Sequence, residues 1–148
     1  MISHQEKWDR RWLELANVIG GWSKDPSTKV GAVIVDGRNR LVSVGYNGLP
    51  QGIVDSHDRL HDRELKYKII IHAERNAVLF AGRSVEECTL YTVPFMPCAS
   101  CAGQMIQSGI AKVVSYENDN PRWQEDFALT QELFDEAGVE LVLYKELP

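Results

Sequence analysis

Two short stretches of this sequence carry side chains that bind metals and move protons. One contains His72 and, two residues later, Glu74; the other contains Cys98 and Cys101 directly after Pro97. Two cysteines three residues apart at the start of a helix lie on one face and can bind one ion together. A helix N-terminus also favours the thiolate form that a metal requires. The spacing therefore predicts a metal site.

His72 is the natural third ligand, because it follows the apolar run "KIII" and precedes a second predicted helix. A His/Cys/Cys set leaves one position of tetrahedral zinc open for water, which is typical of a catalytic zinc, whereas structural sites close with four protein ligands. Glu74 need not bind the metal, but it can accept the water proton and deliver it to a ring nitrogen and a leaving amine. A structural zinc with a fourth ligand elsewhere, or a free thiol pair, is the alternative.

The surrounding sequence predicts the elements that would position this group. Apolar residues at three- and four-residue steps predict an amphipathic helix over residues 6–22, with Trp8, Trp12 and Trp22 in the core. Two β-branched segments, 30–36 and 40–46, are typical of an antiparallel hairpin. Further helices are expected over 72–81, 97–108 and 121–138, ended by Gly82, Gly109 and Gly138, and further strands over 88–93, 112–116 and 139–145.

These elements follow the order α-β-β-α-β-α-β-α-β, which predicts a mixed sheet with parallel pairs in its second half and helices on both faces. At 148 residues, without repeats or linkers, the chain fits one domain over residues 1–148. A net charge of -5 argues against wrapping long nucleic acids. The lack of a signal peptide or a membrane-length apolar run, together with three cysteines, predicts a cytoplasmic location.

The chain resembles the cytidine/deoxycytidylate deaminase family, and within it the deoxycytidylate (dCMP) deaminases. The pattern H-x-E followed by P-C-x-x-C is the signature of zinc deaminases. The resemblance extends over "SKDPSTKVGAVIV", "GYNGLPQG", "KYKIIIHAERNAV", "PCASCAGQMIQSGI" and "FDEAGVEL". It implies an α/β protein with the three-layer α/β/α cytidine deaminase-like fold, in which a five-stranded mixed sheet carries zinc at two helix N-termini.

The resemblance also implies hydrolytic deamination of dCMP to dUMP and ammonia, in pyrimidine nucleotide biosynthesis. Zn²⁺ would be bound by His72, Cys98 and Cys101, and Glu74 would transfer protons. Two alternatives stay open: a deaminase of another cytosine nucleoside or nucleotide or of a tRNA base, and a zinc-stabilised nucleotide-binding module without catalysis.

Substrate contacts are implied at Asn47, which would face the sugar, and at backbone groups around Ala73 and the 93–96 turn, with Val93 and Pro94 foremost, which would face the base. The turn in "TVPFMPC" is one residue longer than the "LFPC"-type turn of many relatives, so base or sugar preference could differ. The 5'-phosphate needs cations or helix N–H groups. The candidates are Lys24, Lys29, Arg75, Lys112 and Arg122, with Arg122 favoured because it follows a strand end.

The resemblance further implies a homo-oligomer with dCTP and dTTP as effectors, and neither a membrane nor a nucleic-acid partner. Residues 47–66 form a long polar loop with room for a short helix, and would contribute to the regulatory site. Within it, His57 and His61 have the spacing of two metal ligands, although a solvated charged loop is the simpler interpretation. Cys88 is expected to be a small buried apolar side chain.

Overall fold

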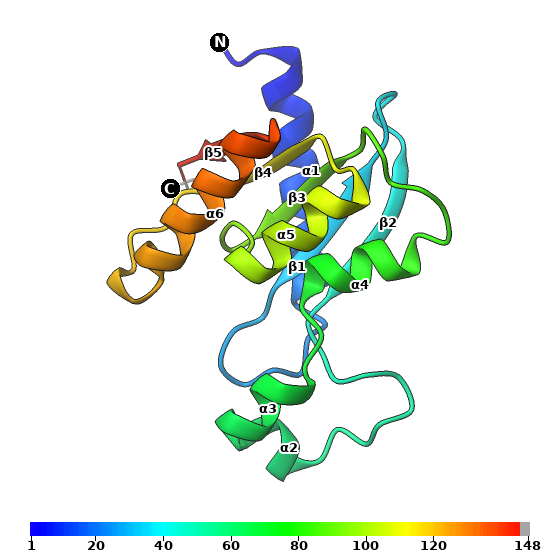
Figure 1. The fold of residues 1–148 in the computed structure, drawn as a ribbon. Coiled ribbons are helices and arrows are strands. Elements are labelled where there is room, and N and C mark those ends of the chain that lie inside the picture. Colours follow the sequence, from blue (N-terminus) through cyan, green and yellow to red (C-terminus); the bar gives the residue numbers. More distant parts are fainter. Residues whose placement is uncertain (146–148) are drawn as a thin grey trace.

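A computed structural model describes residues 1–145, so that 146–148, the end of the predicted 1–148 domain, lie outside the described residues. One five-stranded sheet has the order β2-β1-β3-β4-β5 (Figure 1). The strands are β1 (Gly31–Val35), β2 (Leu41–Tyr46), β3 (Thr89–Val93), β4 (Lys112–Tyr116) and β5 (Glu140–Tyr144). The helices are α1 (His4–Gly20), α2 (His57–His61), α3 (Arg63–Ile69), α4 (Ala73–Phe80), α5 (Ala99–Ser108), α6 (Gln124–Ala137) and the 3-10 helix η1 (Pro121–Trp123).

The sheet is mixed, as the alternation of strands and helices predicted. β1 pairs antiparallel with both β2 and β3, whereas β3, β4 and β5 pair in parallel. In the turn of the hairpin, the carboxylate of Asp36 accepts hydrogen bonds from the backbone N–H groups of Arg38 and Arg40, at 2.9 and 3.0 Å. These bonds close the predicted β1–β2 hairpin locally.

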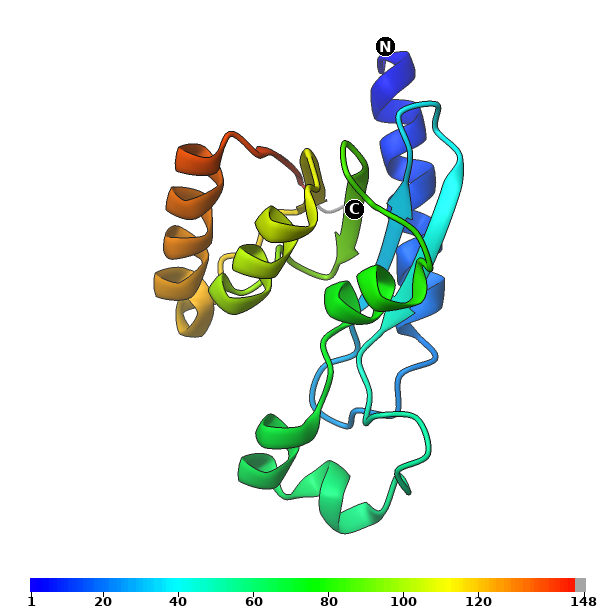
Figure 2. The same cartoon turned by 45° about the vertical axis from the view of Figure 1, so that its right-hand side comes forward.

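Helices cover both faces of the sheet, which confirms the three-layer α/β/α fold. α1 packs on one face, where Leu13 joins Val33 and Tyr91 in one buried cluster. α4, α5 and α6 pack on the other face, where Ala77 and Phe134 belong to a second cluster (Figure 2). The functional side chains of α4 and α5 therefore share one side of the sheet.

α1 differs from its predicted range of 6–22 at both ends. Its N-cap Ser3 starts it earlier, and its last residue is Gly20. Trp22 is consequently beyond the helix and 60% exposed, so its predicted core position is wrong. Trp8 and Trp12 are half-buried, with their rings stacked at a centroid distance of 5.9 Å.

The polar stretch 47–66 contains more structure than the single short helix expected there. α2 and α3 lie beyond the end of the sheet (Figures 1 and 2). Each begins at a capping side chain: Ser56 accepts the Arg59 N–H at 3.3 Å and Asp62 accepts the Leu65 N–H at 3.1 Å. No helix among residues 1–145 has the length and apolar character needed to cross a membrane.

The two helices that carry the predicted ligands begin later than expected. α4 follows the N-cap His72 and α5 follows the N-cap Cys98, so Pro97 lies before the N-cap and not in the first turn. α4 packs directly on β2 because Gly45 has no side chain: a Cβ there would be 2.5 Å from the Ala77 nitrogen. The glycines after α4, α5 and α6 have positive φ angles of 65°, 88° and 81°, as expected for residues that end helices.

Candidate active site

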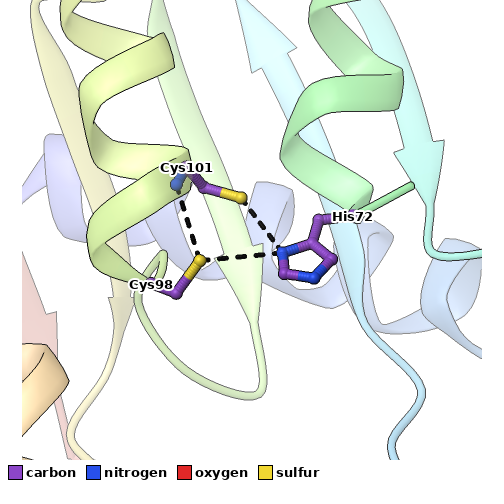
Figure 3. Close-up of side chains that lie close together, drawn as sticks. All are labelled: His72, Cys98 and Cys101. Atoms are coloured by element: carbon purple, nitrogen blue, oxygen red, sulfur yellow. Dashed lines mark hydrogen bonds between the residues drawn. The ribbon is translucent and has the colours of Figure 1, made fainter. Parts of the chain in front are cut away.

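Two helix N-termini bring His72, Cys98 and Cys101 together (Figure 3). The Nδ1 atom of His72 is 3.1 Å from the Sγ atom of Cys101 and 3.7 Å from that of Cys98. The Cys98 sulfur also accepts the backbone N–H of Cys101 at 3.5 Å, as an N-cap does. The three residues thus face one point from the first turns of two neighbouring helices.

The donor set fits zinc. Zinc–nitrogen and zinc–sulfur bonds of about 2.0 and 2.3 Å place tetrahedral donors roughly 3.5 to 3.8 Å apart. The ligand atoms of the three residues all lie within 4.8 Å of one another, and no other such group of three occurs among residues 1–145. With two sulfurs and one imidazole, the set matches the ligand preference of zinc and leaves a fourth position for a non-protein ligand.

The electrostatics of the three side chains also favour a metal. The hydrogen bond from the Cys101 thiol lowers the pKa of Cys98 to about 4, so Cys98 is a thiolate at neutral pH. That bond and burial raise the pKa of Cys101, and the hydrogen bond with Cys98 raises the pKa of His72. A bound cation would replace the protons held between these groups.

Glu74 lies next to this group but is not part of it. It is the second residue of α4, is only 4% exposed, and accepts a hydrogen bond from the Thr92 hydroxyl at 3.2 Å. Burial raises the pKa of its carboxyl group above the ordinary value. A buried carboxyl group in this position can act as a general acid and a general base.

A cavity of about 750 Å³ opens onto these residues. Its apolar wall includes an aromatic cluster in which Phe95 contacts Trp123 and Phe127, at centroid distances of 6.0 and 5.6 Å. The lining residues are Asp25, Ser27, Thr28, Val30, Asn47, Arg63, Lys66, Tyr67, Ile70, His72, Ala73, Glu74, Phe95, Met96, Cys98, Arg122, Trp123, Asp126 and Phe127. A volume of this size is typical of a small-molecule site.

Three of the five predicted substrate residues line this cavity: Asn47, Ala73 and Arg122. Val93 and Pro94 do not, because the Val93 side chain is buried in the α1-side cluster and Pro94 is exposed. Phe95 and Met96, the other two residues of the 93–96 turn, do line the cavity. The turn therefore borders the cavity through its second half.

Asn47 is largely occupied by bonds within the protein. Its Oδ1 accepts the Val30 N–H at 2.9 Å, and its Nδ2 donates to the Thr28 carbonyl at 2.9 Å and to Asp25 at 3.3 Å. One lone pair of Oδ1 is left for a further donor. Asn47 therefore also fixes the loop that precedes β1.

Sequence reasoning missed the cations and the tyrosine that α3 contributes. The hydroxyl oxygen of Tyr67 accepts hydrogen bonds from Arg63 at 2.9 Å and from Arg122 at 3.4 Å. Lys66 is 3% exposed and forms a buried ion pair with Asp25 at 3.0 Å. The sequence showed only a charged loop here, because Asp25 and Arg122, the partners of Lys66 and Tyr67, lie far from α3 along the chain.

The remaining candidates have other positions. Lys24 pairs with Asp55 at 3.0 Å, Arg75 donates to Ser100 at 2.8 Å, and neither Lys29 nor Lys112 lines the cavity. His57 and His61 do share a helix, α2, with stacked rings 3.8 Å apart, but within residues 1–145 no third ligand completes a metal group there. Cys88 is buried, as expected.

A mixed α/β sheet with a zinc-type ligand set at two helix N-termini and a buried carboxyl group beside it defines a zinc-dependent hydrolytic deaminase. The family model described as "Cytidine and deoxycytidylate deaminase zinc-binding region" matches residues 6–117. The chain belongs to the cytidine and deoxycytidylate deaminase family.

Relatives agree with this assignment. An Aliivibrio fischeri protein described as "Uncharacterized deaminase in luxG 3'region" is 48% identical over 138 residues, which cover 91% of this chain and 92% of that protein. A "Probable deoxycytidylate deaminase" of Caenorhabditis elegans is 39% identical over 135 residues, covering 88% of this chain and 66% of that protein. The structure of a cyanophage S-TIM5 dCMP deaminase with dCMP and dUMP shares the fold, with a TM-score of 0.73 at 23% identity over 97% of this chain and all of that one.

Proposed function

We propose that this protein deaminates dCMP to dUMP and ammonia, with His72, Cys98 and Cys101 as the zinc ligands and Glu74 as the proton carrier. The observation that carries the proposal is that one cavity is lined both by Glu74 and His72 and by the arginines Arg63 and Arg122. A cytosine nucleotide has the matching chemistry, with a hydrolysable amine at one end and an anion at the other.

The arginine end of the cavity suits a 5'-phosphate. Arg63 and Arg122 both donate to the oxygen of Tyr67, which leaves the Tyr67 proton and further guanidinium N–H groups for a ligand. Two guanidinium groups held this close repel each other and gain from an anion between them. The aromatic cluster of Phe95, Trp123 and Phe127 would give the nucleoside an apolar wall.

The other end suits chemistry at C4 of the pyrimidine. Zinc bound there lowers the pKa of a water molecule and so supplies a nucleophile at neutral pH. Glu74 takes up a proton from the attacking water and delivers it to ring atom N3. The bond between C4 and its amino nitrogen then breaks, Glu74 transfers the second water proton to the leaving amine, and C4 keeps the oxygen as the carbonyl of dUMP.

A substrate panel tests this proposal. Ammonia release by the zinc-loaded protein is measured with dCMP, deoxycytidine and tRNA. We expect kcat/KM for dCMP to exceed that for deoxycytidine by about 100-fold or more, because charge-assisted hydrogen bonds contribute roughly 1.5–3 kcal/mol each. Equal turnover of deoxycytidine, preferred turnover of tRNA, or dCMP binding without product would each contradict the proposal.

The same proposal includes a cytoplasmic role in pyrimidine nucleotide biosynthesis, assembly into a homo-oligomer, and dCTP and dTTP as effectors. Relatives named deoxycytidylate deaminase support the pathway. The rate against dCMP concentration, measured with and without each triphosphate, tests regulation. A hyperbolic curve that neither triphosphate changes would remove that part.

A further inference from the structure

Thr92 is a fully buried hydroxyl in an otherwise apolar layer. It is the fourth residue of β3, opposite Ala32 of β1, and it lies on the same face of the strand as Leu90. Ala32 and Leu90 both belong to the apolar cluster beneath α4, α5 and α6. Valine has the same shape as threonine and would fill this place without a polar atom.

A buried hydroxyl group destabilises a protein unless it finds a hydrogen-bond partner. The partner of Thr92 is Glu74, whose Oε1 accepts the hydroxyl proton at 3.2 Å. Both side chains are buried, Thr92 completely and Glu74 to 4% exposure. The hydroxyl is therefore aimed at the carboxyl group that carries the protons in the proposed reaction.

The main chain around Thr92 is held firmly. The parallel pairing of β3 with β4 runs as far as Tyr91 and Val114. One residue further on, the buried Ser115 hydroxyl donates to the Thr92 carbonyl oxygen at 2.6 Å. Because threonine is also stiff about its first side-chain torsion, the hydroxyl has little freedom to turn away from Glu74.

We propose that Thr92 is a positioning residue, which holds one oxygen of the Glu74 carboxyl group so that the other faces the reacting water and base. This inference rests on the proposed proton transfer by Glu74. It assigns a function to a hydroxyl group that the packing of β3 does not need.

Two variants distinguish the effect of Thr92 on the orientation of Glu74 from its effect on packing. Thr92→Val keeps the shape of the side chain without the hydroxyl group, and Thr92→Ser keeps the hydroxyl group. In the zinc-loaded enzyme, we expect Thr92→Val to lower kcat for dCMP by roughly 10-fold or more, because a misdirected carboxyl group transfers protons slowly. KM should stay within about 2-fold and the zinc content unchanged, since neither depends on this hydroxyl group. Tm should change little, because valine removes one buried polar group but leaves an oxygen of Glu74 without its donor. Thr92→Ser should restore most of kcat.

Thr89→Val is the matched control, since Thr89 belongs to the same strand whereas the hydroxyl that donates to Glu74 is that of Thr92, and its kcat should be unchanged. Normal kcat in Thr92→Val would overturn the inference, even if Glu74→Gln is inactive and the proposed function stands. Loss of zinc in Thr92→Val, or a Thr92→Ser variant as slow as Thr92→Val, would also overturn it. An active Glu74→Gln variant would instead contradict the proposed function itself.

Discussion

Glu74 is a buried carboxyl group that lies beside the candidate metal ligands without belonging to them. It must be buried, which raises its pKa and makes it a proton donor as well as an acceptor, and it must lie beside a metal site without binding the metal. Its place in the first turn of α4, two residues after His72, satisfies both. The neighbouring helix start would supply the sulfur ligands, which would leave Glu74 free for the proposed proton transfer.

Replacing Glu74 by glutamine tests whether Glu74 transfers protons without binding the metal. Glutamine has the same shape but cannot carry a proton between water and base. We expect Glu74→Gln to keep one zinc per chain and to lose roughly 100- to 10,000-fold in kcat for dCMP. Zinc is measured by atomic absorption and turnover by ammonia release. A variant with normal turnover would exclude Glu74 as the proton carrier.

At the scale of elements, the cavity depends on α3 and η1, which carry the two arginines that donate to Tyr67. Arg63 and Tyr67 come from α3, and Arg122 comes from η1. Arg122 also lies over the Trp123 ring, at 4.7 Å from its centroid, which orients the guanidinium group. The proposed phosphate end of the site therefore exists only where these two elements meet.

Neutralising either arginine should weaken phosphate binding selectively. We expect Arg122→Gln and Arg63→Gln each to raise KM for dCMP by roughly 10-fold or more, from the loss of one charge-assisted contact. KM for deoxycytidine, which has no phosphate, should change little. Arg38→Gln, in the exposed turn between β1 and β2, is the control. Equal effects on both substrates would place the arginines outside phosphate recognition.

α3 is fastened to the cavity wall by the buried pair of Lys66 and Asp25. Lys66 donates to Asp25 and to Ser27, both at 3.0 Å, and Asp25 in turn contacts Asn47. Removing one partner of a buried ion pair leaves an uncompensated charge in a place that water does not reach. Lys66 therefore helps to hold α3 against the loop before β1.

Lys66→Met should lower the free energy of unfolding by about 3–5 kcal/mol, because Asp25 loses its counter-ion. Urea denaturation followed by circular dichroism measures the change. Lys68→Met, on an exposed position of the same helix, should change it by less than about 0.5 kcal/mol. If the two variants were equally stable, the buried pair would contribute nothing to holding α3.

For the whole molecule, α1 and the candidate site lie on opposite faces of the sheet. On the α1 face, the buried carboxylate of Asp9 accepts hydrogen bonds from Tyr91 and Tyr144, both at 2.6 Å, and from Gln5 at 2.8 Å. Burial and this carboxylate raise the pKa of both tyrosines, so they remain donors at any physiological pH. One residue thereby joins α1, β3 and β5.

Asp9→Ala should therefore lower stability without impairing the site on the other face. We expect the free energy of unfolding to fall by about 2–4 kcal/mol, since buried donors lose their acceptor. The zinc content and kcat for dCMP should stay within about 2-fold of the unchanged protein, at a temperature where the variant is folded. Glu14→Ala, at an exposed position of α1, is the control. A selective loss of kcat in Asp9→Ala would show that the faces are coupled.

Local spacing predicted the candidate ligand group and the type of sheet. The ligand motifs indicate helix starts, because a helix start and its first turn involve only neighbouring residues. The order of strands and helices predicted the mixed sheet. Local patterns did not predict features that depend on the surrounding tertiary structure, such as the end of α1. The apolar steps ran on to Trp22, yet α1 ends at Gly20 and leaves Trp22 in solvent.

Only the tertiary structure decided which distant side chains share the cavity. Lys66 and Asp25 are 41 residues apart, and Arg122 and Tyr67 are 55 residues apart. A lysine in a charged stretch is normally solvated, and whether burial is tolerated depends on a counter-ion that sequence neighbours do not reveal. The spacing of His72, Glu74, Cys98 and Cys101 therefore predicted the proposed chemistry, whereas the packing of α3, η1 and the loop before β1 determined the space around it.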